Sequence, residues 1–291
     1  MKLSVITVAY NQPEFILYQY KLLKKFLQNN FTFYIYDNSN TIDINNEITN
    51  ICSKNNIIQI TIPRNRNGIE EDASIGAGQS LDFSIKHNIE NYNPDFGLIL
   101  DSDMFLIKKY NFVENLISDY VGLPQAIDHI RYYNNQLAML NFKKLKDFEK
   151  YPKYLPGIIE GVRCDCGCYL YEYFNKNKNI THNGLTTNIH SAQVNLQNID
   201  SYDLLCNNNN LYNYYKNEIQ ICIDTKSEFE SSKRPYDITK YKDVSFSELI
   251  FDDTFLHFRA GSNWINHDES YTKNRKQNLF DYFNKILKED E

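Results

Sequence analysis

The first hundred residues alternate between short apolar runs and longer segments with helical spacing. Residues 3–9 form a β-branched run that ends at YNQP (10–13), a turn signal whose proline is suited to the start of a helix. Residues 14–27 then place apolar side chains three and four positions apart, as in a helix. This alternation is typical of a parallel sheet covered by helices on both faces. The predicted strands are residues 3–9, 31–36, 57–62 and 96–100, and the predicted helices are 14–27, 42–52 and a segment from 72 or 74 to about 89.

Polar residues follow the predicted strands at their carboxyl ends. These residues are Asn11, Asp37, the RNRNG segment at 64–68, Asp101 and Asp103. In open parallel α/β sheets, ligands bind beyond the carboxyl ends of the strands. We therefore expect these four loops to converge on one crevice.

The stretch GLILDSDMFLI at 97–107 places two carboxylates in an otherwise apolar run. In a strand, side chains two residues apart point to the same face, so Asp101 and Asp103 are predicted to project together. Two like charges at that spacing raise each other's pKa unless a cation neutralises both. The pair therefore indicates a cation site, and the alternative is a pair of residues that caps the turn after the strand.

The composition is that of an ordinary globular protein. The chain has 291 residues, enough for a sizeable core, and a net charge of −6 gives no reason to expect nucleic acid or an anionic membrane as a partner. No run approaches 18 apolar residues, so no membrane span is expected, and the apolar N-terminal run is too short for a signal peptide. Six cysteines are too few for a disulfide scaffold. These features favour a reduced, cytoplasmic protein.

The second half of the chain is less regular. Strand-like pieces are expected at 122–127 and 136–142, residues 175–217 and 225–242 are polar, and an amphipathic helix is expected at 278–288. There is no internal repeat and no clean linker. We predict a single domain over 1–291, with a nucleotide-sugar-binding half at 1–110, an acceptor and metal-completing half at 111–270 and a C-terminal helix at 271–291.

Two common nucleotide-binding signatures are absent. No GxxxxGK[ST] segment occurs, and no GxGxxG follows the first strand. Gly76 and Gly78 lie instead in the first turns of a predicted helix, where each glycine costs up to roughly 1 kcal/mol against alanine. We expect this cost to reflect close approach of the backbone to a ligand or to the sheet.

Several segments together resemble the GT-A glycosyltransferases, closest in style to the family 2-like group. They are SVITVAYNQPEF, FYIYDNSN, RNRNG and LILDSDMF, all within residues 1–110, and FLHFRAGSNW at 255–264. The resemblance implies a Rossmann-like, mostly parallel α/β sheet with a variable C-terminal acceptor half. It also implies a glycosyltransferase that moves a sugar from a nucleotide-sugar to a hydroxyl acceptor such as a growing glycan.

A divalent cation fits this chemistry, because it stabilises the charge of the leaving diphosphate. Mg²⁺ and Mn²⁺ both accept carboxylate oxygens as ligands. The resemblance implies that Asp103 is a direct ligand and that Asp101 contacts the ribose or a metal-bound water. His257 would complete the site, and an imidazole ligand favours Mn²⁺ over Mg²⁺. The alternative for His257 is a core histidine beside a glycine turn.

Three residues of the first two loops are candidates for binding the nucleoside. The resemblance places Asp37 where a carboxylate contacts the uracil or ribose, which implies a UDP-sugar donor. The alternative is an Asx-turn at this residue. Tyr10 and Asn11 would line the base pocket, although Asn11 is equally suited to cap the following helix.

Other polar residues are candidates for binding the diphosphate. Arg64 and Arg66 are suited to face it, and solvated loop arginines are the alternative. Arg259 and Ser262 follow His257 and are suited to hold phosphate oxygens. Trp264 is suited to shield the site or stack on a sugar.

An inverting enzyme of this class needs a carboxylate base for the acceptor hydroxyl. Asp165 lies before a helix-like segment in the second half, where the resemblance implies that this base lies, and Asp128 and Glu160 compete for the role. The neighbouring cysteines, at 164, 166 and 168, lack the spacing of a zinc site and are expected to be buried structural residues.

Two other classes of function remain open. A sugar-nucleotide nucleotidyltransferase also uses an α/β sheet with acidic metal ligands, but it usually has a glycine-rich basic loop after the first strand, and AYNQPEF is not one. A non-catalytic sugar- or protein-binding relative would share the fold without turnover. Donor hydrolysis with Mn²⁺ separates an enzyme from such a binder.

Overall fold

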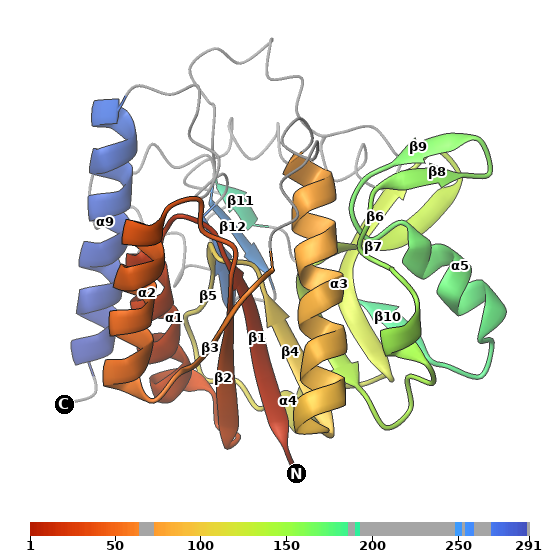
Figure 1. Cartoon of the computed structure of the whole chain (residues 1–291), viewed down its shortest axis with the longest axis horizontal. Coiled ribbons are helices and arrows are strands. Elements are labelled where there is room, and N and C mark those ends of the chain that lie inside the picture. The colour runs from red at the N-terminus through yellow and green to blue at the C-terminus, as the bar shows by residue number, and fades with distance from the viewer. Residues whose placement is uncertain (64–72, 186–189, 193–247, 252–253, 259–268, 290–291) are drawn as a thin grey trace. The chain divides into compact units, whose positions relative to one another are not determined.

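The computed structural model describes residues 1–63, 73–185, 190–192, 248–251, 254–258 and 269–289 (Figure 1). The chain divides into two compact units. Unit 1 comprises Met1–Leu17, Gln28–Ser102 and Asn111–Leu185, and unit 2 comprises Tyr18–Leu27, Asp103–Tyr110 and Thr186–Glu291. No helix among these described residues is both long and apolar enough to cross a membrane.

Unit 1 is built on a sheet of seven strands in the order β10-β6-β7-β4-β1-β2-β3. The strands are β1 (Leu3–Ala9), β2 (Phe31–Asp37), β3 (Ile58–Thr61), β4 (Phe96–Leu100), β6 (Tyr120–Ile127), β7 (Ile130–Asn141) and β10 (His182–Gly184). Strands β3, β2, β1 and β4 pair in parallel, and β7 pairs antiparallel to both β4 and β6. This topology confirms the predicted α/β class with a mostly parallel sheet.

The helices of unit 1 cover the two faces of this sheet. They are α2 (Ile42–Asn55), α3 (Ala73–Tyr92), α4 (Phe112–Asn115) and α5 (Tyr169–Lys176), with a short η1 turn (Phe148–Lys150) and the first residues of α1 (Pro13–Phe26). Successive side chains of β2 point to opposite faces. Accordingly, the Tyr36 hydroxyl lies 3.2 Å from Nδ1 of His87 on α3, whereas the Asp37 carboxylate binds Asn45 on α2.

Local sequence accounts for the ends of α2. The Thr41 hydroxyl accepts a hydrogen bond from the Ile44 N–H at 3.3 Å, which caps the first turn. Asn56 ends the helix in the left-handed conformation (φ 56°), which asparagine tolerates better than most residues. Ile48 and Cys52 face inward, so that the helix packs through a narrow apolar stripe.

Unit 2 contains a four-stranded antiparallel sheet in the order β11-β12-β13-β5. Its strands are β5 (Met104–Leu106), β11 (His190–Ala192), β12 (Glu248–Phe251) and β13 (Phe255–His257), and its helical part is the second half of α1 together with α9 (Glu269–Lys288). Aromatic contacts hold these elements together. The Phe105 and Phe283 rings lie 4.7 Å apart, and the Tyr110 and Phe255 rings lie 5.0 Å apart.

Two elements are longer than the sequence patterns predict. Strand β7 begins at Ile130 rather than at 136, because the polar, half-buried residues 134–136 hide the alternation in mid-strand. Helix α9 begins at Glu269 rather than at 278, because its first turns are polar and show no apolar period.

The two glycines of α3 have different surroundings. A Cβ atom at Gly78 would lie 2.1 Å from the Tyr154 carbonyl oxygen, whereas one at Gly76 would have no neighbour within 4 Å. The close approach predicted for Gly78 is therefore to the backbone of the loop before β8 (Gly157–Ile159), not to the sheet.

We expect Gly78→Ala to destabilise the protein by about 2 kcal/mol, because the added methyl group overlaps a backbone carbonyl that cannot move freely. Gly76→Ala is the matched control on the same helix and should stabilise it by up to ~1 kcal/mol through helix propensity. Thermal unfolding of both variants tests this pair. A stabilising effect of alanine at position 78 would contradict the packing described here.

Candidate metal and donor site

Asp101 lies directly after β4, at the carboxyl edge of the parallel strands. Its N–H donates to the Gln136 carbonyl on β7 at 2.7 Å, and its Oδ1 accepts from the Ser102 N–H at 2.8 Å. These bonds fix the backbone where the chain leaves the sheet. The side chain is half-buried.

Asp103 and His257 face each other within unit 2. Strand β13 pairs antiparallel with β5, so that His257 is the register partner of Met104, and the Phe258 N–H donates to the Asp103 carbonyl at 2.9 Å. This register brings His257 Nε2 to 3.2 Å from Asp103 Oδ1. Both residues are 3% exposed. The backbone pairing therefore places an imidazole against a buried carboxylate.

The three side chains fit a divalent cation. One ligand atom from each of Asp101, Asp103 and His257 lies within 4.8 Å of the other two. A cation about 2.1 Å from two adjacent ligand atoms would hold those atoms about 3.0 Å apart, and the Asp103–His257 spacing of 3.2 Å is near that value. Two carboxylates and an imidazole are a donor set that accepts Mn²⁺. The same 3.2 Å distance also suits a direct ion pair between Asp103 and His257, so the core-histidine alternative stays open.

We expect His257→Gln to weaken Mn²⁺-dependent nucleotide binding roughly 10–100-fold, the range found when supporting groups of metal sites are removed. Melting of the metal-free protein should change much less than binding does. His129→Gln, an exposed histidine of unit 1, is the control. A large loss of metal-free stability with unchanged metal dependence would favour the core-histidine alternative.

Asp37 is buried at the end of β2, and both of its carboxylate oxygens accept hydrogen bonds. Oδ1 accepts from the N–H of Ser39 at 2.8 Å and from the Ser39 hydroxyl, while Oδ2 accepts from Asn45 Nδ2 at 2.6 Å and from Gln59 Nε2 at 3.0 Å. Asp37 is 2% exposed. The Asx-turn that was the alternative interpretation of this residue is therefore present, and contact of Asp37 with a nucleoside stays a prediction.

The loops after β1 and β2 are tied together by side chains. The Asn11 Oδ1 accepts from the Asn40 N–H at 2.8 Å, and Asn40 Nδ2 donates to the Tyr10 hydroxyl at 2.7 Å. Asn11 adopts a φ of 52°, the left-handed region. Tyr10 and Asn11 therefore lie together beside the second loop, and Asn40 is a residue of this group that the sequence did not single out.

Asp165 lies after β9 (Val162–Cys164), close to the loop that carries Asp101. Its N–H donates to the Tyr132 hydroxyl at 3.0 Å, and its Oδ1 accepts from the Cys166 N–H at 2.8 Å. Burial, together with the negative charges of Asp165 and Asp101, raises the pKa of the Cys166 thiol to about 12. Two carboxylates near one thiol indicate that Asp165 and Asp101 lie on the same side of unit 1.

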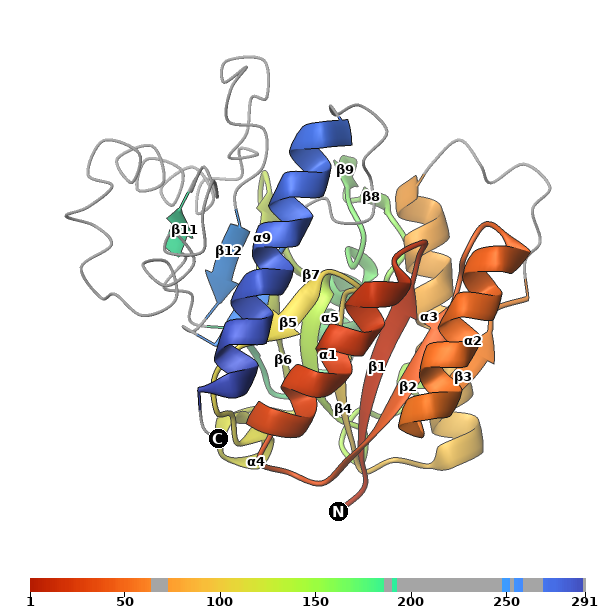
Figure 2. The same ribbon diagram turned by 90° about the vertical axis from the view of Figure 1, so that its left-hand side faces the viewer.

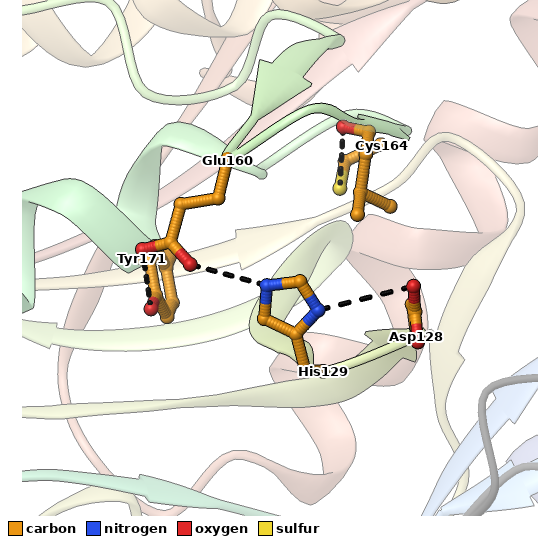
Figure 3. A network of polar contacts seen from close by, with 6 residues as sticks. Asp128, His129, Glu160, Cys164 and Tyr171 are labelled. Carbon is orange, nitrogen blue, oxygen red and sulfur yellow. Dashed lines mark hydrogen bonds and ion pairs between the residues drawn. The ribbon is translucent and has the colours of Figure 1, made fainter.

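The competing carboxylates lie at the tips of two hairpins (Figure 3). Asp128 is at the β6–β7 turn with 72% of its side chain exposed, and Glu160 is at the β8–β9 turn with 54% exposed. His129 Nε2 lies 3.1 Å from Glu160 Oε2, and the Tyr171 hydroxyl donates to Glu160 Oε1 at 3.0 Å. Because a strand rises about 3.4 Å per residue, the β6–β7 turn lies on the order of 20 Å along β7 from Gln136, the partner of Asp101.

Some predicted residues lie outside the described part of the chain. These are Arg64, Arg66, Arg259, Ser262 and Trp264.

A buried lysine that no sequence pattern indicates lies in the loop that contacts Asp82 on α3. Lys153 is 2% exposed, and its ammonium group donates to the carbonyls of Phe148 and Tyr151. The Asp82 carboxylate on α3 accepts from the N–H groups of Lys153 and Tyr154. Burial lowers the pKa of Lys153 to about 8 and raises that of Asp82 to about 6. These contacts fasten α3 to the loop before β8.

No family model matches the sequence, and no curated protein matches it. Among solved structures, the chain is similar to the mannosyltransferase PcManGT from Pyrobaculum calidifontis in complex with GDP-Man and Mn²⁺, with 10% identity, a TM-score of 0.36, and coverage of 50% of this chain and 45% of that chain. It is also similar to S. aureus TarS 1-349, with 16% identity, a TM-score of 0.37 and coverage of 60% and 55%. For TarS 1-349 in complex with UDP, the identity is 18% and the TM-score is 0.35, with coverage of 52% of this chain and 50% of that chain. The chain thus spans about half the length of these structures.

Proposed function

We propose that this protein is a metal-dependent glycosyltransferase that moves a sugar from a nucleotide-sugar, a UDP-sugar, to a hydroxyl acceptor such as a growing glycan, with inversion. The observation that carries the proposal is the group of ligand atoms from Asp101, Asp103 and His257. Asp101, its first member, directly follows β4 at the carboxyl edge of a mostly parallel sheet. That edge is where α/β sheets bind nucleotides.

In this proposal the candidate residues have separate roles in binding the cation and the phosphates. Asp103 and His257 hold a divalent cation, Mn²⁺ in preference to Mg²⁺, with Asp101 beside them. When bound, this cation supplies positive charge that stabilises the leaving diphosphate. Phosphate oxygens are assigned to the side chains Arg64, Arg66, Arg259 and Ser262.

The nucleoside is assigned to the loops after β1 and β2. Tyr10 and Asn11 are joined to Asn40 by hydrogen bonds, so these loops offer a connected polar surface for a base and a ribose. The choice of uracil rests on the resemblance at Asp37. Because the Asp37 oxygens already accept bonds from Ser39, a ligand N–H would have to replace or share one of those bonds.

Asp165 is assigned as the base. The acceptor oxygen bonds to the anomeric carbon of the sugar while its proton passes to the Asp165 carboxylate. The bond from the anomeric carbon to the diphosphate oxygen breaks, and its electron pair leaves with the diphosphate. The proximity of Asp165 and Asp101 to one thiol supports this choice over Asp128, which lies exposed at a hairpin tip.

Free thiols support a reducing compartment and hence the cytoplasm. The described cysteines Cys52, Cys164, Cys166 and Cys168 are all free and buried. The Cys166 and Cys168 thiols donate to the carbonyls of Ser74 and Leu155, which requires the protonated thiol. These cysteines act as small core residues rather than as a zinc site.

A thermal-shift experiment tests the proposed function. At a hundredfold excess of ligand over its Kd, binding to the native state alone adds about 2.7 kcal/mol of stability. We expect UDP to raise the melting temperature by several degrees with Mn²⁺, less with Mg²⁺, and not with EDTA. Equal stabilisation with EDTA would count heavily against the metal site.

Hydrolysis of UDP-sugars in the presence of Mn²⁺ then separates an enzyme from a binding protein. Release of UDP supports transfer chemistry. Nucleotide binding without any release from a panel of donors would favour the non-catalytic alternative, and formation of a nucleotide-sugar from a nucleoside triphosphate and a sugar phosphate would favour the nucleotidyltransferase.

A further inference from the structure

Strand β7 lies between β4 and β6 in the sheet of unit 1, and its pairing with β6 is interrupted (Figure 2). Ala138 is the register partner of Gly122, and Tyr133 is the register partner of Pro124. Residues 134–137 of β7 therefore lie opposite a single residue of β6. Such a bulge bends a strand and changes the direction of its side chains, and bulges are over-represented next to active sites.

This interruption begins where β4 ends. The last register pair of β4 joins Leu100 to Leu137. The neighbouring residue of β7, Gln136, accepts the Asp101 N–H through its carbonyl at 2.7 Å. Residues 134–136 are Asn, Asn and Gln, and all three are half-buried. Because strands inside such a sheet are ordinarily apolar, three consecutive amides need an explanation. We call residues 134–136 the β7 bulge.

Internal hydrogen bonds account for only part of the β7 bulge. The Asn134 Oδ1 accepts from the Gln136 N–H at 3.0 Å, and the Asn134 Nδ2 donates to Gln136 Oε1 at 3.3 Å. Among the described residues, none hydrogen-bonds the Asn135 amide or the Gln136 Nε2. A half-buried amide without a partner loses part of its hydration without compensation. Both residues are therefore suited to bind a ligand.

The β7 bulge lies along the strand between the contacts of two carboxylate residues. At one end, Gln136 accepts the Asp101 N–H, and beyond the other end the Tyr132 hydroxyl accepts the Asp165 N–H at 3.0 Å. Because a strand rises about 3.4 Å per residue, at most about 14 Å of β7 separates residues 132 and 136. A sugar ring with its hydroxyl groups fits within that span.

Neutral amides between two carboxylates suit an uncharged ligand that carries hydroxyl groups. An amide both donates and accepts hydrogen bonds, as a hydroxyl does. A phosphate group would instead be repelled by Asp101 and Asp165 unless a cation lay beside it. The proposed reaction places the diphosphate at the cation beside Asp101, so the nearest uncharged ligand group is the sugar bonded to that diphosphate.

We propose that Asn135 and Gln136 bind hydroxyl groups of the transferred sugar and so determine which nucleotide-sugar the protein uses. This inference rests on the proposed transfer reaction. Asn134 is a positioning residue in it, because it contacts Gln136 rather than the sugar. A site that hydrogen-bonds a substrate hydroxyl rejects analogues that lack it, because the polar group of the site is then left without a partner.

Hydrolysis of UDP-sugars without an acceptor tests this inference. The donors are UDP-glucose, UDP-galactose, UDP-N-acetylglucosamine and UDP-N-acetylgalactosamine, which share the nucleotide and differ only in the sugar. We expect Asn135→Ala to lower kcat/KM for the best of these donors roughly 10-fold, and for the worst by less than about threefold, because only the best donor loses its hydrogen bonds. Gln136→Met keeps the length of the side chain without its amide and should lower the selectivity in the same way.

The matched control is Asn183→Ala, an exposed asparagine of β10 in the same sheet whose amide donates to the Ser118 hydroxyl. Its selectivity should equal that of the unchanged protein. UDP with Mn²⁺ should raise the melting temperature of every variant equally, because UDP lacks the transferred sugar. The same melting curves show whether each variant is folded.

Three results would overturn the inference while the transfer reaction stands. They are equal hydrolysis of the donors by the unchanged protein, unchanged selectivity in both bulge variants, and an equal fall for every donor together with loss of the UDP shift. The last result would mean that the β7 bulge only supports Asp101. If the unchanged protein hydrolyses none of the donors, the proposed reaction is rejected and this inference with it.

Discussion

Asp103→Asn should abolish most sugar transfer while the protein stays folded. Asparagine keeps the shape of the side chain beside His257 but removes the negative charge that would hold the cation. A cation contributes several kcal/mol of charge stabilisation to a leaving diphosphate, and ~3 kcal/mol corresponds to roughly a 10²-fold change in rate. We therefore expect transfer to fall at least about 10²-fold, measured as UDP release at saturating Mn²⁺.

The control for this prediction is Asp281→Asn, the same chemical change at an exposed position of α9 whose carboxylate accepts a bond from Gln277. Its transfer rate should match that of the unchanged protein. The Asp103→Asn protein should also lose the Mn²⁺-dependent thermal shift with UDP. If it keeps that shift and its rate, Asp103 is not a ligand, and the 3.2 Å contact with His257 is an internal ion pair.

The sequence predicted the first half of the chain well, because its apolar runs are uninterrupted. Strands β1 and β4 have the predicted bounds, and β2 is one residue longer, ending at Asp37. In a parallel sheet buried on both faces, a short continuous apolar run is a strand with few alternatives. The pair of Asp101 and Asp103 could be recognised in the sequence because it interrupts such an apolar run.

The second half was harder to predict for physical reasons. Strand β7 passes through the polar residues Asn134, Asn135 and Gln136, so the alternation of apolar and polar side chains is lost there. Gln136 is also the residue whose carbonyl accepts the Asp101 N–H. The pairing of Met104 with His257 joins segments far apart in the chain, and no local pattern encodes that register. His257 was predicted to be a ligand only through the resemblance of the segment that contains it.

Other features had no sequence signal. Lys153 is buried because its ammonium group binds the Phe148 and Tyr151 carbonyls and lies 4.2 Å from the centre of the Phe148 ring. A lysine in a polar loop is ordinarily predicted to be exposed to solvent. The sequence predicted a close backbone approach at both Gly76 and Gly78, to a ligand or to the sheet. The prediction was wrong for Gly76, which has no neighbour within 4 Å, and at Gly78 the neighbour is the Tyr154 carbonyl.

The choice between Asp165 and Asp128 shows what structure adds to a candidate list. Each is a single carboxylate that directly follows a strand, β9 for Asp165 and β6 for Asp128. The fold separates them, because Gly167 approaches the Tyr133 carbonyl so closely that a Cβ atom would lie 1.9 Å from it, which presses the 165–168 turn against β7. Asp128 lies at the exposed end of the β6–β7 hairpin.

Asp165→Asn should therefore lower transfer by roughly 10²–10⁴-fold, the range for loss of a general base. The amide keeps an oxygen for the Cys166 N–H, so the turn and the backbone bond to Tyr132 should persist. Binding of UDP with Mn²⁺ should stay near that of the unchanged protein, which separates loss of the base from loss of the site.

Asp128→Asn is the matched control, and its rate should be unchanged. A normal rate for Asp165→Asn with a slow Asp128→Asn would move the base to Asp128. If neither substitution matters and the product keeps the anomeric configuration of the donor, transfer proceeds with retention and needs no such base, because the acceptor then approaches from the face that the diphosphate leaves.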